Sequence, residues 1–216
     1  FAFSSSKKAE QNRVWVGLSK ETAHQLGTPI SSLLAWVDLL QMRHPDDKMI
    51  AEMSKDVSRL RIIAERFSKI GSVPDLQLVS LNETILTAVN YITNRTSDKV
   101  KIQCHFPDKN HIFIKLNVPL FEWVIENLCK NAIDAMDGSG KIYLTISKTA
   151  KECIIDVKDT GKGIERKKFK TVFNPGFTTK SRGWGLGLSL AKRIIEEYHE
   201  GKIYVKSSEL NIGTTF

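Results

Sequence analysis

Apolar residues in the first third of the chain recur at the alternating spacing of three and four residues that an amphipathic helix produces. The pattern breaks once, at the segment RHPDD around Pro45, because proline cannot continue a helix. Asp46 or Asp47 is a suitable N-cap for a second helix. The apolar positions are Leu26, Ile30, Leu33, Val37 and Leu40 in the first helix and Ile50, Met53, Val57, Leu60, Ala64 and Phe67 in the second. The pattern therefore predicts a helical hairpin.

The predicted hairpin is expected to dimerise. Two helices alone bury one stripe each and leave much apolar surface in contact with water. Pairing with a second copy would close a four-helix bundle and cover that surface. The sequence therefore predicts a homodimer held together by a four-helix bundle.

After the segment GSVPD the pattern changes to a mixture of strand-like and helical runs. Strands are predicted at residues 99–106, 111–116, 141–149, 152–160 and 201–208, and helices at residues 82–93, 119–136 and 186–198. These elements lack a regular strand–helix–strand alternation, which favours a mixed sheet covered by helices on one face. The chain is therefore predicted to be of the α+β class, with a helical hairpin followed by an α/β sandwich.

Composition excludes several classes of protein. Of 216 residues, 41% are hydrophobic and 26% charged, so the chain can bury a core and is neither collagen-like nor wholly disordered. No apolar run approaches the roughly 20 residues of a membrane-spanning helix, and FAFSSSKK lacks a signal-peptide pattern. Three cysteines without a CxxC pair encode neither a disulfide framework nor a cysteine zinc site. We expect a cytoplasmic protein with no membrane contact within this chain, either on its own or as the cytoplasmic part of a membrane-anchored protein.

Positive charge is concentrated between residues 162 and 182. Seven Lys and Arg side chains there oppose only Glu165, so the segment carries 7 − 1 = +6 of the formal net charge of +8. The segment is too long for an ordinary connection and is predicted to be a functional lid. A nucleic-acid-binding protein more often lays its basic residues along an element with interleaved aromatic residues. A compact polyphosphate therefore fits better and no nucleic-acid partner is expected, with a merely solvated loop as the alternative.

Three further segments could contact a polyphosphate. DTGKGI at residues 159–164 follows a predicted strand and GWGLGL at residues 183–188 opens a predicted helix, and both offer backbone N–H groups to phosphate oxygens. GWGLGL is not a Rossmann fingerprint, because no predicted strand leads directly into it, and the sequence contains no GxxxxGK(S/T) for a P-loop. In ENLCKNAIDAM at residues 126–136, Asn127 and Asn131 stand four apart and project from one helix face, where two amides suit a metal ion and a phosphate. Such a pair alone would have a surface or capping role.

Taken in order, these segments resemble the ATP-binding domain of sensor histidine kinases, within the superfamily shared with DNA gyrase and mismatch-repair ATPases. ENLCKNAIDAM resembles the N box, DTGKGI the G1 box, FNPGFTTK the F box, GWGLGLSLAKRI the G2 box and the terminal GTTF the last box. Ahead of them, ETAHQLGTPISSL is similar to the H box of the phosphoacceptor helix. The resemblance covers nearly the whole chain from about residue 12. Because the last box ends at Phe216, we expect the closing strand of the usual domain to lie beyond it.

The resemblance implies that the chain binds ATP and Mg²⁺. The residues implied for ATP are Asn127, Lys130, Asn131, Asp159, Gly161, Gly163, Thr179, Lys180, Gly183, Gly185, Leu186, Gly187, Leu188 and Thr214. Asp159 would accept a hydrogen bond from the adenine amine, with Thr214 supporting the contact. Asn131 would hold Mg²⁺ through its carbonyl oxygen, and Lys180 would neutralise charge on the transferred phosphoryl group.

His24 is the phosphoacceptor that the resemblance implies. It lies two positions before Leu26 of the buried seam, roughly 200° around the helix, so it is expected to face solvent. The next residue is Gln25, where the family often has Glu or Asp as a proton acceptor, and an amide cannot take that role. Thr28, one turn along the same face, would position water for removing phosphate from a response regulator, the partner protein that the resemblance implies. The implied catalytic residues are His24, Gln25, Thr28, Asn127 and Lys180.

Two other functions stay open from the sequence. Related ATPases that hydrolyse ATP place a Glu, as general base, four residues before the magnesium-binding Asn. Here that position is Asn127, which cannot deprotonate water, so phosphoryl transfer is favoured. A degenerate kinase that only scaffolds a partner would not need Asp159, Asn131 and His24. The sequence thus predicts a protein histidine kinase that autophosphorylates on His24 and passes the phosphoryl group to an aspartate of a response regulator.

The predicted organisation has three parts. Residues 1–10 resemble the end of a linker helix, residues 11–71 would form the dimerisation and histidine phosphoacceptor domain, and residues 76–216 would form the catalytic ATP-binding domain. The expected partners are a second copy of the chain and the receiver domain of a response regulator.

Overall fold

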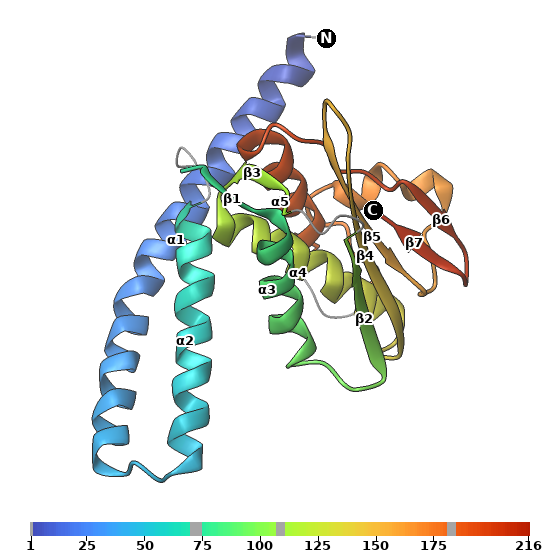
Figure 1. Cartoon of the computed structure of the whole chain (residues 1–216). Helices are drawn as coiled ribbons and strands as arrows, with labels where there is room; N and C mark the ends of the chain where they lie inside the picture. The colour runs from blue at the N-terminus through green and yellow to red at the C-terminus, as the bar shows by residue number, and fades with distance from the viewer. Residues whose placement is uncertain (1, 70–74, 107–110, 181–184) are drawn as a thin grey trace. The chain divides into compact units, whose positions relative to one another are not determined.

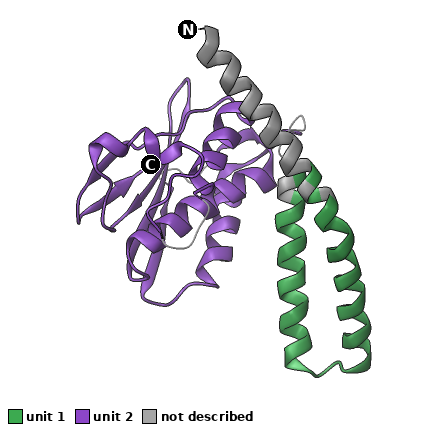
Figure 2. Cartoon of the chain, turned by 180° about the vertical axis from the view of Figure 1, so that it is seen from behind, with its two compact units in different colours: residues 1–74 green, residues 75–216 purple. Residues whose placement is uncertain are grey.

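The structure, a computed structural model, describes residues 2–69, 75–106, 111–180 and 185–216 (Figure 1). In the first of these ranges, side chains are described from residue 21 onward, except those of residues 22, 24, 66, 67 and 69. The chain divides into two compact units, Phe1–Pro74 and Asp75–Phe216 (Figure 2). No helix in the described ranges combines the length and the apolar character needed to cross a membrane.

The first unit consists of two long helices, α1 (Ala2–Arg43) and α2 (Lys48–Lys69). The buried residues of their contact are Ile30 and Val37 of α1 and Ile50, Val57 and Ala64 of α2. On each helix these residues are seven positions apart, which is the repeat of a coiled-coil seam. Asp47 Oδ1 accepts a hydrogen bond from the backbone N–H of Met49 (2.8 Å) and thereby caps α2. Pro29 lies inside α1 and does not end it.

Part of the predicted apolar seam stays exposed in the single chain. The exposed members are Leu26, Leu33 and Leu40 of α1 and Met53 and Leu60 of α2, which keep 39–47% of their surface. The side chain of Phe67 lies outside the described residues. Each helix therefore carries an apolar stripe beside its buried column, and one hairpin does not cover it.

The second unit is built on a five-stranded mixed sheet with the strand order β2-β4-β5-β7-β6. The strands are β2 (Val100–His105), β4 (Gly140–Lys148), β5 (Cys153–Asp159), β6 (Ser207–Glu209) and β7 (Gly213–Thr215). Strands β2 and β4 are parallel, and the other neighbouring pairs are antiparallel. A separate antiparallel sheet joins β1 (Gln77–Ser80) to β3 (Phe113–Leu116).

Helices α3 (Leu81–Thr93), α4 (Val118–Ala135) and α5 (Gly187–Arg193) share one hydrophobic core with the five-stranded sheet (Figure 1). A π-helical turn, η3 (Ile194–Tyr198), continues α5. Two short 3₁₀ turns, η1 (Arg166–Lys168) and η2 (Thr171–Phe173), lie between β5 and α5. The basic segment of the sequence therefore contains local structure of its own.

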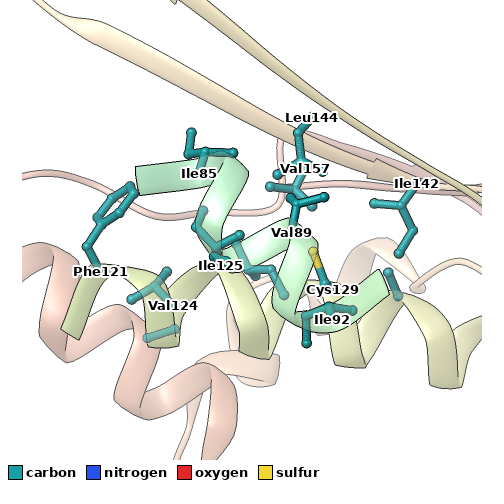
Figure 3. Packing of buried hydrophobic residues seen from close by; sticks show 14 of the residues in the cluster. Ile85, Val89, Ile92, Phe121, Val124, Ile125, Cys129, Ile142, Leu144 and Val157 are labelled. Carbon is teal, nitrogen blue, oxygen red and sulfur yellow. The ribbon is translucent and has the colours of Figure 1, made fainter. Parts of the chain in front are cut away.

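The core of the second unit lies between the sheet and the helices. In β4 alternate residues are buried, and Ile142 and Leu144 face the helices (Figure 3). Ile85 of α3 and Val124 and Ile125 of α4 pack in the same cluster. Because burying each such side chain contributes roughly 1.5–3 kcal/mol, this packing holds α4 firmly against the sheet.

The predicted α+β class, with a mixed sheet and helices on one face, is confirmed. The strand predicted at residues 201–208 is wrong over most of its length, since only β6 forms at its end. Ile203 and Val205 are apolar because they pack in a small second cluster with Val172 and Phe173, and not because they alternate in a ladder. The helix predicted at residues 186–198 is divided between α5 and η3.

Candidate nucleotide site

Helix α4 carries the amide side chains that the sequence assigns to a nucleotide. Its N-cap is Asn117, whose Oδ1 accepts a hydrogen bond from the backbone N–H of Leu120 (3.2 Å). Asn127 and Asn131 lie one turn apart, and Asp134 follows three residues later. Residues at these spacings are neighbours on a helix surface, so the three side chains share one face of α4.

Among the described residues, the side-chain nitrogen of Asn127 has no hydrogen-bond acceptor. Asn127 Nδ2 is enclosed and has no partner among the described residues. An enclosed polar atom without a partner costs free energy, which a ligand can recover by supplying an acceptor such as a phosphate oxygen. A Cβ placed on Gly187 would lie 3.3 Å from Asn127 Oδ1, so α4 and the start of α5 meet at this side chain.

Asp159 ends β5 and is buried, with 3% of its surface exposed. Its Oδ1 accepts hydrogen bonds from the backbone N–H groups of Gly161 (2.8 Å) and Thr214 (3.2 Å). Burial raises the pKa of Asp159 above its ordinary value, and the two backbone hydrogen bonds oppose that shift. Both backbone donors use Oδ1, so Oδ2 is the oxygen that can accept from a donor such as the amine of adenine.

Ser208, which none of the sequence motifs includes, supports the Asp159 region. Its Oγ accepts a hydrogen bond from the backbone N–H of Ile164 (2.7 Å) and lies 2.9 Å from Thr214 Oγ1. It also donates to the carbonyl oxygen of Gly213 (3.0 Å). Ser208 thereby joins the loop after β5 to the β6–β7 hairpin. In the sequence it is indistinguishable from an exposed strand serine.

Two glycines let the main chain approach itself closely around the site. Gly163 has a φ of +74°, and a Cβ there would lie 2.2 Å from the carbonyl oxygen of Glu209. Gly185 has a φ of +64°, and a Cβ there would lie 2.5 Å from the carbonyl carbon of Gly176. Both conditions require glycine, so these positions of the G1 and G2 boxes are fixed by backbone geometry.

The loop that contains Gly161 is attached to the C-terminal end of α4. The backbone N–H of Lys162 donates to the carbonyl oxygen of Ala135 (2.9 Å). A Cβ on Gly161 would lie 2.7 Å from the same oxygen, so the close approach needs glycine there too. This attachment places the loop after β5 beside the helix that carries Asn127 and Asn131.

Lys180 reaches the same face of α4 from the other end of the basic segment. Its Nζ donates to Asn131 Oδ1 (3.1 Å) and forms an ion pair with Asp134 Oδ2. The side chains of Lys180 and Asp134 are 40% and 52% exposed. The structure thus brings Lys180 together with Asn131 and with Asp134, which lies in the segment ENLCKNAIDAM but receives no role from the sequence.

The other residues assigned to ATP are tied to this site less closely. Lys130 and Thr179 are exposed. Leu186 and Leu188 are partly buried, and Leu188 packs against both apolar clusters of the second unit. Gly183 lies outside the described residues.

The segment assigned to the phosphoacceptor lies in α1. His24 belongs to this helix, and its side chain lies outside the described residues. Gln25 is exposed, and its Nε2 donates to Glu21 Oε1 one turn earlier (2.8 Å). Thr28 is also exposed, and its carbonyl oxygen accepts a hydrogen bond from Ser32 Oγ (3.3 Å). The Gln25 amide is therefore engaged along the helix.

The residues of the second unit fit ATP with magnesium. Asn131 and Asp134 offer oxygen atoms, which Mg²⁺ prefers, and Lys180 offers a compact positive charge for phosphate. The described residues contain no group of three or more His, Cys, Asp or Glu that could hold a metal ion. Magnesium commonly binds through one or two carboxylates together with phosphate and water oxygens, so the residues present are enough.

Comparison with known proteins gives matches along the whole chain. Residues 117–216 match the family described as histidine kinase-, DNA gyrase B- and HSP90-like ATPase. The chain is 33% identical to the sensor histidine kinase ZraS of Salmonella typhimurium, over 94% of this chain and 45% of that protein. It is 25% identical to sporulation kinase C of Bacillus subtilis, over 98% of this chain and 50% of that protein.

Solved structures of one kinase share the fold. The catalytic domain of histidine kinase ThkA is similar with a TM-score of 0.59 and 28% identity, over 66% of this chain and 92% of that one. The structure of ThkA in complex with the response regulator protein TrrA gives a TM-score of 0.61 and 22% identity, over 100% of this chain and 66% of that one.

Residues 117–216, from the N-cap of α4 to the last box, belong to the histidine kinase-, DNA gyrase B- and HSP90-like ATPases. Within this class, the second unit is the ATP-binding domain of a sensor histidine kinase. The chain spans half or less of the length of the curated relatives named above.

Proposed function

We propose that this chain is the catalytic core of a protein histidine kinase, which binds ATP with Mg²⁺ in its second unit and transfers the γ-phosphoryl group to His24. The observation that carries the proposal is the buried Asp159 carboxylate, whose Oδ1 is held by two backbone N–H groups while Oδ2 can accept from a ligand. The enclosed Nδ2 of Asn127, which has no partner in the part of the chain that the structure describes, adds a donor. The amine of adenine and a phosphate oxygen supply the complementary groups.

Each residue of the second unit has a distinct task in binding. Asp159 Oδ2 accepts from the adenine amine, and the hydrogen bonds to Oδ1 hold the carboxylate in position. Asn127 Nδ2 donates to a phosphate oxygen, and the Lys180 ammonium offsets phosphate charge. Asn131 offers its carbonyl oxygen to magnesium, which when bound neutralises charge that develops on the phosphates.

Transfer to histidine is favoured over hydrolysis by the chemistry of Asn127. An amide cannot deprotonate water, so the second unit lacks a general base at the position where related hydrolases have Glu. In the transfer, an unprotonated ring nitrogen of His24 attacks the γ-phosphorus, ADP leaves, and the other ring nitrogen loses its proton. Gln25 has no basicity, and its amide donates a hydrogen bond to Glu21, so solvent takes that proton.

The first unit is proposed to form the dimer. The stripe of Leu26, Leu33 and Leu40 lies beside the buried column of α1 and keeps 39–45% of its surface exposed. A second copy can cover this stripe with its own, which closes a four-helix bundle. Residues 11–71 would then be the dimerisation and phosphoacceptor domain, and residues 76–216 the catalytic domain.

The proposed partner is the receiver domain of a response regulator, whose aspartate accepts the phosphoryl group from His24. Sequence similarity to named sensor kinases and the fold shared with ThkA, solved with the response regulator protein TrrA, support this partner. Thr28 is exposed one turn after His24, where its hydroxyl could position water for removing phosphate from the regulator.

Labelling with ATP that carries a radioactive γ-phosphate tests the proposed function. With Mg²⁺, the protein should take up a label that acid removes and base does not, as expected for phosphohistidine. His24→Gln should abolish the label and leave the affinity for the ATP analogue AMPPNP nearly unchanged, because the acceptor and the nucleotide site lie in different units. An intact label in His24→Gln would refute the assignment of His24, and loss of AMPPNP binding would refute the division of roles between the units.

A further inference from the structure

Two oxygen atoms of α4 converge on one ammonium group. Asn131 Oδ1 and Asp134 Oδ2, three residues apart on the helix, both contact Lys180 Nζ, with 3.1 Å between Nζ and Asn131 Oδ1. Lys180 lies 46 residues after Asp134, so this is a tertiary contact. One amide oxygen and one carboxylate oxygen thus hold a single positive charge.

A local ion pair was available to Asp134. Lys130 precedes Asp134 by four residues on α4, a spacing that allows an ion pair along the helix. Its ammonium lies instead 3.9 Å from Glu126 Oε2. Asp134 is therefore paired with the residue that comes from the basic segment and shares its contact with Asn131.

The two oxygens are of the kind that magnesium prefers. Mg²⁺ usually binds through one or two carboxylates and phosphate oxygens, and Asn131 alone would supply a neutral amide. Asp134 supplies the missing negative charge one turn away. An ammonium with one positive charge holds this oxygen pair in the nucleotide-free protein, and a divalent ion is a stronger competitor for it.

We infer that Asn131 and Asp134 form a cation cradle that Lys180 occupies in the nucleotide-free protein and that magnesium takes over when it arrives with ATP, which frees Lys180 for the phosphates. Asp134 then contacts the metal ion directly or through a bound water. The inference rests on the proposed binding of ATP with Mg²⁺ and assigns Asp134 as a residue that positions Lys180.

In this cradle, Asp134 has opposite effects on the affinity for nucleotide with and without magnesium. Without magnesium, Asp134 keeps Lys180 away from the phosphates and repels them with its own charge. With magnesium, Asp134 stabilises the metal, and Lys180 is available to the nucleotide. Asp134 would therefore make tight nucleotide binding depend on the metal.

Calorimetry with AMPPNP, in excess Mg²⁺ and in excess EDTA, tests this dependence. Asp134→Asn should raise affinity in EDTA by up to about fivefold, the range of an exposed ion pair, and lower affinity in Mg²⁺ by roughly tenfold. The control is Asp137→Asn, which removes the same charge from an exposed residue just past α4. Asn is suited to the φ of +51° at that position, so this variant should keep the wild-type dependence on Mg²⁺.

A second measurement follows Lys180 without any nucleotide. An amine-reactive reagent, with mass spectrometry of each lysine, should label Lys180 faster in Asp134→Asn than in the wild type and Asp137→Asn. Equal labelling in all three proteins would overturn the inference. So would an Asp134→Asn protein whose affinity for AMPPNP changes by the same factor with and without Mg²⁺, because Asp134 would then have a structural role only. A wild type that binds no AMPPNP would overturn the proposed function itself, and this inference with it.

Discussion

Asp159 is buried and accepts two backbone hydrogen bonds through Oδ1, which suits it to accept another from a ligand through Oδ2. The two backbone donors to Oδ1 offset some of the cost of enclosing a carboxylate. They also fix the direction in which Oδ2 points. A side chain held in this way selects a donor on the ligand, which is the basis of discrimination between an amine and a carbonyl at the same position of a purine.

Replacement of Asp159 by Asn should weaken ATP binding by about 1.5–3 kcal/mol, the scale of a hydrogen bond to a charged group. The amide can present a donor where the adenine amine needs an acceptor. Calorimetry with AMPPNP measures the loss, and Asp156→Asn on the same strand, whose carboxylate pairs with Lys206, is the matched control. Because burial raises the pKa of Asp159, wild-type affinity should fall on acidification at a higher pH than the ordinary value of 3.8 would give. Unchanged affinity in Asp159→Asn would remove Asp159 from the site.

The sequence motifs assign Asp159, Asn127, Asn131 and Lys180 to the site, but they assign no role to Ser208, which lies outside the motifs, or to Asp134, which lies within the segment ENLCKNAIDAM. Ser208 contacts Ile164, 44 residues away, and Asp134 contacts Lys180, 46 residues away. Contacts of this kind depend on the tertiary fold, and neither hydrophobic period nor local spacing records them.

At the scale of elements, α4 is joined to the end of η3 by a partly buried histidine, His199. The backbone N–H of Asn117, the N-cap of α4, donates to His199 Nε2 (3.0 Å), so this nitrogen carries no proton. His199 Nδ1 lies 2.8 Å from the carbonyl oxygen of Ile194 and donates to it. The imidazole is therefore neutral, and burial lowers its pKa below the ordinary value.

Protonation of His199 should loosen this link and destabilise the second unit. The unfolded chain takes up a proton near the ordinary pKa of 6.5, whereas the folded protein resists protonation to lower pH, so stability is lost as pH falls below about 6.5. In His199→Gln the side chain can still offer an acceptor to Asn117 but does not titrate. Chemical denaturation between pH 7 and pH 5 should show a weaker pH dependence for this variant.

His105→Gln, which removes an exposed imidazole, is the control for the histidine link. It should keep the pH dependence of the wild type. If His199→Gln also kept it, the link between Asn117 and His199 would not be the group that responds to pH.

Elements with a long, regular pattern were predicted best, whereas two of the short strands were not predicted. The strands predicted at 141–149 and 152–160 agree with β4 and β5 to within a residue at each end. Strands β1 and β7, with four and three residues, are too short to show a period and were missed.

At the scale of the whole molecule, the proposed dimer depends on the exposed apolar stripe of the first unit. Leu33 is 41% exposed in the single chain and lies within this stripe. Leu33→Glu would bury an unpaired charge in the dimer, so sedimentation should show monomers or aggregates. Ser31→Glu adds the same charge on a different face of α1 and should leave the dimer intact. A dimer that persists in Leu33→Glu would place the interface elsewhere.

The sequence predicts one domain that ends at residue 71 and another that begins at residue 76. The two compact units of the structure meet between Pro74 and Asp75. The break was visible because composition and period change together there. The sequence does not indicate which residues of the apolar seam are buried within the hairpin, because all of them are apolar and follow the same spacing. The structure separates them: Ile30 and Val37 are buried in the hairpin, and Leu33 is not.

The crowding at Gly163 also limits how the sequence can change over many generations. Any side chain there meets the main-chain oxygen of Glu209, and no second substitution removes a carbonyl group. At Gly201, by contrast, the nearest atom to an added Cβ is Ile195 Cγ2 at 3.1 Å, which a compensating mutation of Ile195 could withdraw. Substitution of Gly163 is therefore not tolerated, whereas substitution of Gly201 is tolerated when Ile195 also changes. A library of random variants selected for folding should retain Gly163 more strictly than Gly201.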